Sequence, residues 1–325
     1  MTEQDYIYEV YKERSFSAAA QNLYVSQPAL STSVKKAEKA LGITIFDRST
    51  SPISLTEAGK VYITALESIR QIERQTRDKL ADMSELRTGR VVVSGENFVS
   101  SFILPSIIMR FSEKYSGIEV ELVESNSPDL RQLLLTEAID LLVAHNFDPD
   151  LYTAQPLGDE SLLLAVPEGL PINRRLAGYA LRNEDILAGR HLEPDCPAVD
   201  LSLFREELFL VLKKGNDMQR RAAALCEEAG FTPRVRIRLD QLITSYNLAC
   251  AGMGVAFVTD TIVTAARGRN CLYYRLDSPH ATRRMYIGYK HNRYISRACA
   301  AFIETAKETY AENDLFRTHH AALAP

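Results

Sequence analysis

The segment from Ser15 to Gly59 constrains the fold of this 325-residue chain more than any other segment. Ser15 is a typical helix N-cap, and it is followed by a run of small helix formers. After the short connector Tyr24-Val25, Ser26 and Pro28 open a second helix, because a proline in the first turn loses no hydrogen bond. The sequence therefore predicts two helices joined by a tight turn.

The second predicted helix is amphipathic. Its apolar side chains recur at the spacing of one helix face, namely Leu30, Val34, Ala37 and Leu41. The opposite face carries short hydrogen-bonding groups followed by cations: Gln27, Ser31, Thr32, Lys35, Lys36 and Lys39. A helix that enters the major groove of DNA needs base-reading groups near its N-terminus and cations beside them for the phosphates. We therefore expect DNA contacts from Ser26, Gln27, Pro28, Ser31, Thr32 and Lys35.

A short hairpin is predicted after this helix. Residues 43–48 and 53–55 read as strands around the polar tip Ser49–Pro52. Arg48, at the base of this wing, is expected to contact a phosphate or the minor groove. Each piece alone is an ordinary amphipathic helix or surface hairpin, but the ordered set is typical of a winged helix-turn-helix.

The same residues carry a family resemblance. Residues 26–31, Glu38 with Leu41-Gly42, Phe46–Arg48 and Leu55–Gly59 resemble the signature of LysR-type transcriptional regulators. The resemblance implies sequence-specific binding of double-stranded DNA, a homodimer or homotetramer, contact with RNA polymerase, and control by a small-molecule effector. Thr32-Ser33 stand where the family often has Arg-Gln, and the wing tip is less basic than is common.

A long helix is predicted next, because residues 56–86 contain no proline and only Gly59 as a glycine. Apolar and small side chains recur along it in steps of three and four: Ala58, Tyr62, Ala65, Ile69, Ile72, Thr76, Leu80 and Met83. Such a seam packs either against its own domain or against a partner helix. Its length and narrowness favour the partner, and the resemblance implies that this linker helix makes the dimer. The expected domains so far are 1–59 for DNA binding and 60–89 for the linker.

Beyond residue 89 the pattern becomes an alternation of strands and helices, which indicates an α/β fold. Strands are predicted at 90–94, 118–124, 141–145, 162–166, 208–212, 234–239, 255–259, 271–276 and 285–289. Helices are predicted at 102–115, 127–139, 217–229, 241–251 and 295–309. The resemblance implies a two-lobed effector domain over residues 90–310, like type II periplasmic binding proteins. Lobe I would hold residues 90–161 and 267–310 and lobe II residues 162–266, with a loose tail at 311–325.

Ligands of open α/β sheets bind beyond the carboxyl ends of the strands, where helix N-termini present free N–H groups. This rule selects the effector-binding candidates Asn97, Ser100, Ser101, Ser127, His145, Lys213 and Thr244. The effector is expected to be polar or anionic, and no other cofactor is implied. Ser127 is equally suited to cap a helix before Pro128, and Lys213 to end a strand in solvent.

Catalysis finds little support in the sequence. It contains no G-x-S-x-G, Walker, H-E-x-x-H or strand-linked G-x-G-x-x-G motif, so we expect no enzyme. His319-His320 have no companion ligands nearby in sequence, so no metal site is expected. The alternatives are a solute-binding protein or a ligand-processing enzyme on the same α/β fold. The first would need an export signal and no helix-turn-helix.

Composition sets further bounds. A net charge of −4 argues against nonspecific coating of nucleic acid, and no apolar run is long enough to span a membrane, so a cytoplasmic protein is expected.

The five cysteines are widely spaced without a C-x-x-C pair, which predicts neither a disulfide scaffold nor a zinc site. Cys196, in a loop, is the one candidate for a reactive thiol. Some members of the resembled family sense peroxide through such cysteines, but no neighbouring residue predicts a lowered pKa here.

Overall fold

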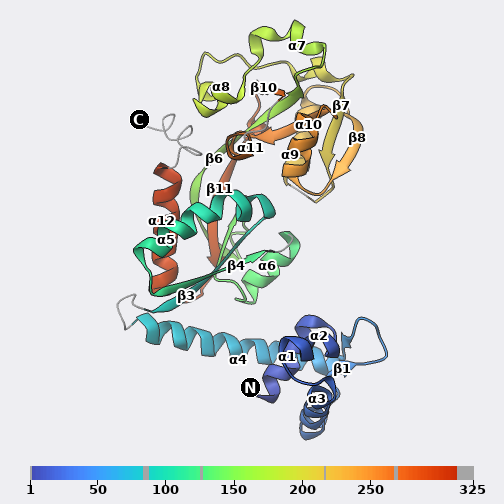
Figure 1. The fold of residues 1–325 in the computed structure, drawn as a ribbon, viewed down its shortest axis with the longest axis vertical. Coiled ribbons are helices and arrows are strands. Elements are labelled where there is room, and N and C mark those ends of the chain that lie inside the picture. The colour runs from blue at the N-terminus through green and yellow to red at the C-terminus, as the bar shows by residue number, and fades with distance from the viewer. Residues whose placement is uncertain (1, 83–87, 125–126, 216, 267–269, 313–325) are drawn as a thin grey trace. The chain divides into compact units, whose positions relative to one another are not determined.

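The structure is a computed structural model that describes residues 2–82, 88–124, 127–215, 217–266 and 270–312. The chain divides into two compact units, with the boundary between Leu80 and Ala81. Each unit is described by itself below (Figure 1). None of the helices in the described part of the chain is both long and apolar enough to cross a lipid bilayer.

The first unit is a helical domain with a small hairpin. In order it contains α1 (Glu3–Glu13), α2 (Phe16–Asn22), α3 (Gln27–Leu41), β1 (Phe46–Asp47), β2 (Ser54–Leu55) and the start of α4 (Glu57–Asp82). The helix α1 was not predicted, although Thr2 and Asp5 form a capping box at its start. The wing strands are only two residues long each, shorter than expected. Leu41 is 46% exposed, so it does not belong to the apolar stripe as predicted, because α3 ends there at Gly42.

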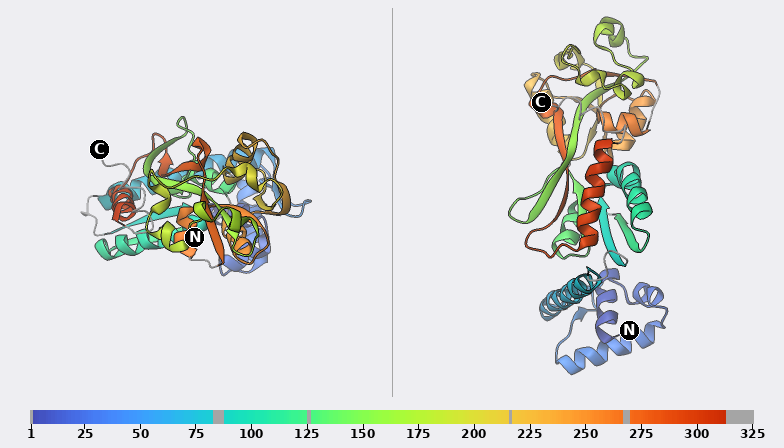
Figure 2. Two further views of the ribbon diagram at one scale, coloured as in Figure 1. Left: turned by 90° about the horizontal axis from the view of Figure 1, so that it is seen from above. Right: turned by 90° about the vertical axis from the view of Figure 1, so that its left-hand side faces the viewer.

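The second unit is built on one mixed sheet. Its strands are β3 (Gly89–Gly95), β4 (Ile118–Glu124), β5 (Leu141–Ala144), β6 (Tyr152–Pro167), β7 (Leu208–Leu212), β8 (Arg234–Leu239), β9 (Val255–Thr259), β10 (Cys271–Arg275) and β11 (Thr282–Lys290). They follow the order β4-β3-β5-β11-β6-β9-β7-β8, with β10 also paired to β6. The strands β3, β4 and β5 are parallel at one end, and β7, β8 and β9 are parallel at the other. Between them, the antiparallel pair β6 and β11 runs from one lobe to the other (Figures 1 and 2).

The chain returns to the first lobe later than expected. The segment after residue 267 was predicted to belong to that lobe, but β10 pairs antiparallel with the end of β6, from Arg275 opposite Leu163 to Cys271 opposite Pro167. This part of β6 also pairs with β9, a strand of the second lobe. The return is therefore made by β11, which starts at Thr282.

Helices cover the sheet of each lobe. They are α5 (Leu104–Lys114), α6 (Ser127–Leu135) and α12 (Arg297–Glu312) around the first lobe, and α7 (Ile172–Arg175), α8 (Asn183–Leu187), α9 (Asp217–Glu228), α10 (Leu242–Cys250) and α11 (Asp260–Ala266) around the second. In Figure 2, α12 lies beside α5, and the rings of Phe111 and Phe302 meet with centroids 5.1 Å apart. The helical segment that leads into α5 begins at Asn97, earlier than predicted, and includes a π-helix at Val99–Ile103 directly before Leu104.

Two further differences from the predictions are local. The helix α6 ends at Leu135, whereas it was predicted to continue to residue 139, because Glu137 takes a left-handed conformation with φ 56°. The helix α11 follows β9 without a loop and was not predicted.

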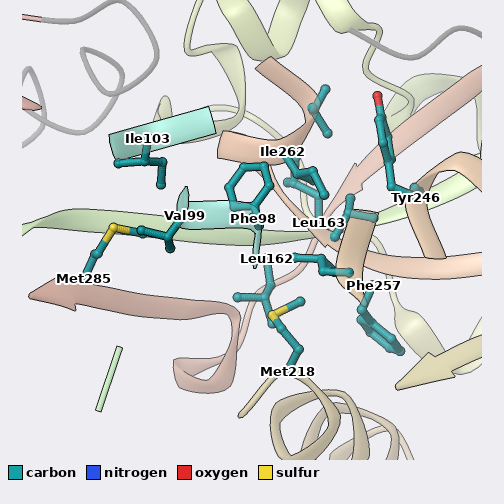
Figure 3. Packing of buried hydrophobic residues seen from close by; sticks show 14 of the residues in the cluster. Phe98, Val99, Ile103, Leu162, Leu163, Met218, Tyr246, Phe257, Ile262 and Met285 are labelled. Atoms are coloured by element: carbon teal, nitrogen blue, oxygen red, sulfur yellow. The ribbon is translucent and has the colours of Figure 1, made fainter. Parts of the chain in front are cut away.

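The apolar core of the second unit is continuous through both lobes. Figure 3 shows Phe98, Val99 and Met285 of the first lobe in the same cluster as Tyr246 and Phe257 of the second. All five side chains are buried. The lobes are thus parts of one packed body.

Candidate nucleic-acid interface and ligand pocket

The helix α3 has the two faces that its sequence predicts. Leu30 and Val34 are fully buried in the first unit. The expected DNA-binding residues Ser26, Gln27, Pro28, Thr32 and Lys35 are exposed, and Ser31 is half-buried. The Ser26 hydroxyl accepts a hydrogen bond from the Ala29 amide at 3.4 Å, so it caps the helix. The exposed face therefore carries hydrogen-bonding groups near the N-terminus of α3 and the cation of Lys35 farther along the helix.

The side chain of Arg48, at the base of the wing, packs against Glu38 of α3 and the Phe16 ring and does not extend freely into solvent. Its guanidinium pairs with Glu38 Oε2 at 2.9 Å, and its Cζ lies 4.8 Å from the centroid of the Phe16 ring. The second oxygen of Glu38 accepts the amides of Ile45 and Phe46 at 2.8 and 3.2 Å. Glu38 thus joins the end of the recognition helix to the base of the wing. Sequence reasoning noted Glu38 only as part of a motif and missed this role.

The start of α4 is fixed by Thr56 and Gly59. The Thr56 hydroxyl accepts the Gly59 amide at 2.9 Å and donates to the carbonyl of Thr44. A Cβ at Gly59 would lie 2.1 Å from the carbonyl oxygen of Ile45, so only glycine fits this approach. These contacts account for the threonine and the glycine of the Leu55–Gly59 motif.

Farther along α4, apolar side chains of the predicted seam are exposed. Ile69 is 43%, Ile72 64% and Leu80 62% exposed, whereas Ile63 and Leu66 are buried in the core of the first unit. Met83 of the seam lies outside the described residues. Exposed large apolar residues on one helix are the expected signature of a surface that binds a partner.

A pocket of about 260 Å³, here called the interlobe pocket, lies in the second unit. Its lining residues from the first lobe are Glu96, Leu130, Arg131, Leu142, Ala144, His145 and Asn146, and those from the second are Gly215, Asp217 and Arg220. Three apolar residues form part of the wall, and charged groups of both signs supply most of the rest. Such a pocket suits a small polar ligand with charged groups.

Asp217, the first residue of α9, links the two lobes at this pocket. Its carboxylate accepts Asn146 Nδ2 at 3.1 Å across the pocket and Arg221 Nε at 3.0 Å from its own helix. Arg283 Nη1 lies 3.8 Å away. Burial acts to raise the pKa of Asp217, but the bonds from Arg221 and Asn146 outweigh it, and the pKa is lowered. The carboxylate is therefore a charged anchor between the lobes.

Behind the pocket, His145 belongs to a buried ionic cluster. His145 Nε2 lies 2.8 Å from Glu160 Oε2, which also accepts Arg283 Nε at 2.7 Å. Burial acts to raise the pKa of Glu160, but the charges of Arg283 and His145 bring it down to about 2. Glu160 is thus ionised, and His145 Nε2 donates to it. Glu160 and Arg283 face each other in register on β6 and β11.

Only one of the residues predicted to bind the effector, among those whose side chains are described, lines the interlobe pocket. This residue is His145. Ser100 is buried and donates to the carbonyl of Gly95 at 2.9 Å, and Lys213 pairs with Asp240 at 2.7 Å. Asn97, Ser101 and Thr244 do not line it either. Ser127 begins α6, but its side chain lies outside the described ones, and so do His319 and His320.

Sequence reasoning missed the charged lining of the pocket. Arg131 is the fifth residue of α6 and Arg220 the fourth of α9, whereas the rule used for the prediction considers only the residues that directly follow a strand. Burial raises the pKa of the Cys196 thiol, which disfavours the reactive thiolate considered for this residue. Among the described residues, no cluster of three or more His, Cys, Asp and Glu side chains is arranged to hold a metal ion.

Comparisons with known proteins agree with this architecture. The model of the family described as bacterial regulatory helix-turn-helix protein, lysR family, matches residues 2–60, and the LysR substrate binding domain matches residues 84–311. The HTH-type transcriptional regulator YcgK of Bacillus subtilis strain 168 is 28% identical over 314 residues, which cover 94% of this chain and 93% of that protein. A probable RuBisCO transcriptional regulator of Synechocystis sp. is 26% identical over 321 residues, covering 97% and 86%.

Solved structures share the fold. CbnR, a LysR family transcriptional regulator also solved with its target DNA, has a TM-score of 0.62 at 17% identity, covering 94% of this chain and 98% of that chain. Full-length OxyR from Pseudomonas aeruginosa has a TM-score of 0.61 at 20% identity, covering 94% and 96%. The chain therefore belongs to the LysR family of transcriptional regulators, with a DNA-binding helix-turn-helix followed by an effector-binding domain.

Proposed function

We propose that this regulator reads a specific DNA site with the exposed face of α3, and that a small molecule in the interlobe pocket controls it. The observation that carries the DNA-binding part is the helix α3 itself. Its apolar face is buried in the first unit, while Gln27 is exposed in its capped first turn and Lys35 is exposed in the middle of the helix. Gln27 and Ser31 would read base edges, and Lys35 would neutralise a phosphate.

A homodimer would form through the exposed apolar side chains of α4, Ile69, Ile72 and Leu80. Burying apolar surface of this kind between two copies is favourable by about 25 cal/mol per Å². Two recognition helices in such a dimer imply half-sites about one helical turn apart, or a multiple of it. By family resemblance the assembly would be a homodimer or a homotetramer that contacts RNA polymerase, and a protein that acts on double-stranded DNA would work in the cytoplasm.

The effector would be a small polar or anionic compound. Arg131 and Arg220 supply cations to the pocket, and the Asn146–Asp217 hydrogen bond closes it from lobe to lobe. A ligand that inserts its own polar groups here competes with that bond and changes the preferred arrangement of the lobes. The ligand regulates DNA binding only through its difference in affinity for the two arrangements. For this regulation the pocket needs only to bind and release its ligand, without chemical turnover.

The DNA-binding part is tested by fluorescence anisotropy on a target duplex found by footprinting and on a random duplex. Gln27→Ala should weaken binding to the target more than to the random duplex, since it removes a base contact. Lys35→Ala should weaken both and flatten the dependence on salt. Equal losses on both duplexes for Gln27→Ala would show that α3 does not read bases.

The effector part is tested by thermal-shift and native mass spectrometry screening of metabolites on the full-length protein. A compound that binds should lose affinity in Arg131→Gln, with Lys214→Gln, in the solvent-exposed turn, as the matched loss of one positive charge. Retention of full affinity in Arg131→Gln would place the effector elsewhere.

A further inference from the structure

A second hollow, here called the aromatic cavity, lies within the first lobe. Its volume is about 490 Å³, and its lining residues are His145, Asn146, Phe147, Pro149, Tyr152, Thr153, Ala154, Tyr286 and His291. It shares only His145 and Asn146 with the interlobe pocket. The other residues come from the loop after β5, from the start of β6, and from Tyr286 in β11 and His291 just after that strand. The two hollows therefore meet at one turn of the chain.

The chemistry of this cavity differs from that of the interlobe pocket. Among the described residues that line it there is no Asp, Glu, Lys or Arg, whereas the interlobe pocket has four such residues. Three aromatic side chains, Phe147, Tyr152 and Tyr286, supply ring faces. A charged ligand would lose its hydration here without gaining a counter-ion. Asp148 and Asp150 in the same loop further disfavour an anion.

The walls of the cavity are held in place by packing. The rings of Phe147 and Tyr152 meet edge to face with centroids 5.6 Å apart, and the Tyr152 hydroxyl donates to the carbonyl of Arg131 at 3.3 Å. A Cβ at Gly288 would lie 2.4 Å from the Phe147 ring, so glycine is what allows that ring its position. Pre-organised walls lower the entropy lost on binding.

A β-bulge next to Tyr286, the third aromatic residue of the cavity, sets the direction of its side chain. Between Met285 and Tyr286 the pairing of β11 with β6 skips one residue, because Gly158 faces Met285 and Pro156 faces Tyr286. Such bulges redirect side chains and are frequent beside functional sites.

Hydrogen-bonding groups lie at the edges of the rings. Thr153 Oγ1 and His291 Nδ1 are 3.1 Å apart, and Tyr286 carries a hydroxyl. His145 Nε2 is committed to the ionised Glu160, so Nδ1 is the ring atom left to form a hydrogen bond with a ligand hydroxyl. These groups suit a ring that carries one neutral polar substituent.

We propose that the aromatic cavity is a second small-molecule site of this regulator, and that it takes an uncharged aromatic compound bearing a hydroxyl group. It is separate from the effector in the interlobe pocket and does not depend on that assignment. Because His145 belongs to both hollows, occupancy of one site changes the surroundings of the other.

The test uses fluorine NMR on the full-length protein with para-fluorophenol as the probe. This phenol is uncharged at pH 7, since phenols titrate near pH 10. The matched anion, para-fluorobenzoate, should show no saturable binding to the cavity. The phenol should bind saturably, and Ala154→Phe should abolish that binding because the new ring fills the cavity. Arg220→Gln, which changes a side chain that lines the interlobe pocket and pairs with Asp217, should leave phenol binding unchanged.

A second variant covers a failure of Ala154→Phe to fold, which circular dichroism and DNA binding would reveal. Tyr286→Leu keeps an apolar side chain and removes one ring, so it should weaken phenol binding about three- to tenfold. The proposal is overturned if the phenol does not bind saturably, if folded Ala154→Phe still binds it, or if Tyr286→Leu binds it with unchanged affinity. Loss of phenol binding in Arg220→Gln would place the probe in the interlobe pocket and also overturn the proposal.

Discussion

Replacing Glu38 with alanine should loosen the wing from the recognition helix without unfolding either. In the native protein one carboxylate oxygen accepts the amides of Ile45 and Phe46, and the other pairs with Arg48. The Glu38 side chain is only 11% exposed, so water replaces these partners poorly. Glu38→Ala leaves two amides and one guanidinium without their acceptor.

The size of the effect follows from these contacts. A hydrogen bond to a charged acceptor contributes about 1.5–3 kcal/mol, against about 0.5–1.5 kcal/mol for a neutral one. Because the Phe46 bond is the longer of the two, at 3.2 Å, we count the pair as about one charged bond. The free energy of local opening should then fall enough to speed amide exchange roughly tenfold to a hundredfold. Glu38→Gln keeps a carbonyl oxygen and should show a much smaller change.

Hydrogen–deuterium exchange of the wing peptide measures this directly. The amides of Ile45 and Phe46 should lose protection in Glu38→Ala, while those of the α3 interior keep theirs. Glu57→Ala is the matched control, since it also removes a glutamate but one whose side chain is 89% exposed. Unchanged exchange at both amides in Glu38→Ala would refute the structural role given to this carboxylate.

Three further predictions follow from other contacts. Ile72→Asp should convert the dimer to a monomer in sedimentation analysis, because it puts a charge into the proposed α4 interface. Glu160→Gln should flatten the dependence of urea stability on pH between 4.5 and about 2, since a depressed carboxylate pKa contributes stability that is lost as pH falls toward it. A flat wild-type profile in that range would contradict it. Gly59→Ala should lower the melting temperature, as its Cβ would meet the Ile45 carbonyl at 2.1 Å and overpacking costs about 1–3 kcal/mol, whereas Gly178→Ala meets nothing within 4 Å and should not.

Local signals made the DNA-binding domain predictable from its sequence. Ser26 as a cap, Pro28 in the first turn and the spacing of Leu30 and Val34 all act within one helix, so periodicity and capping rules suffice. The helix α1 was not predicted, because only two of its residues, Ile7 and Val10, are buried, and two residues do not make a clear apolar stripe.

The long strand β6 shows where local rules end. Only residues 162–166 were predicted as strand, because Asp159 and Glu160 interrupt the apolar pattern. In the structure these carboxylates pair with Arg284 and Arg283 on the facing strand. Their partners are over a hundred residues away, and no local pattern carries that information. The same holds for the interlobe pocket, whose charged lining comes together only when both lobes have folded.

The antiparallel pair β6 and β11 should resist rotation of one lobe against the other elastically. The two strands are paired from Tyr152 opposite Lys290 to Ser161 opposite Thr282, and the ribbon passes from lobe to lobe without a flexible linker. Rotation of one lobe against the other must therefore be taken up as twist spread over many residues, which two-stranded ribbons accommodate readily. A restoring torque opposes every such rotation. The lobes should thus rotate through small angles around one rest position and return to it when the ligand leaves.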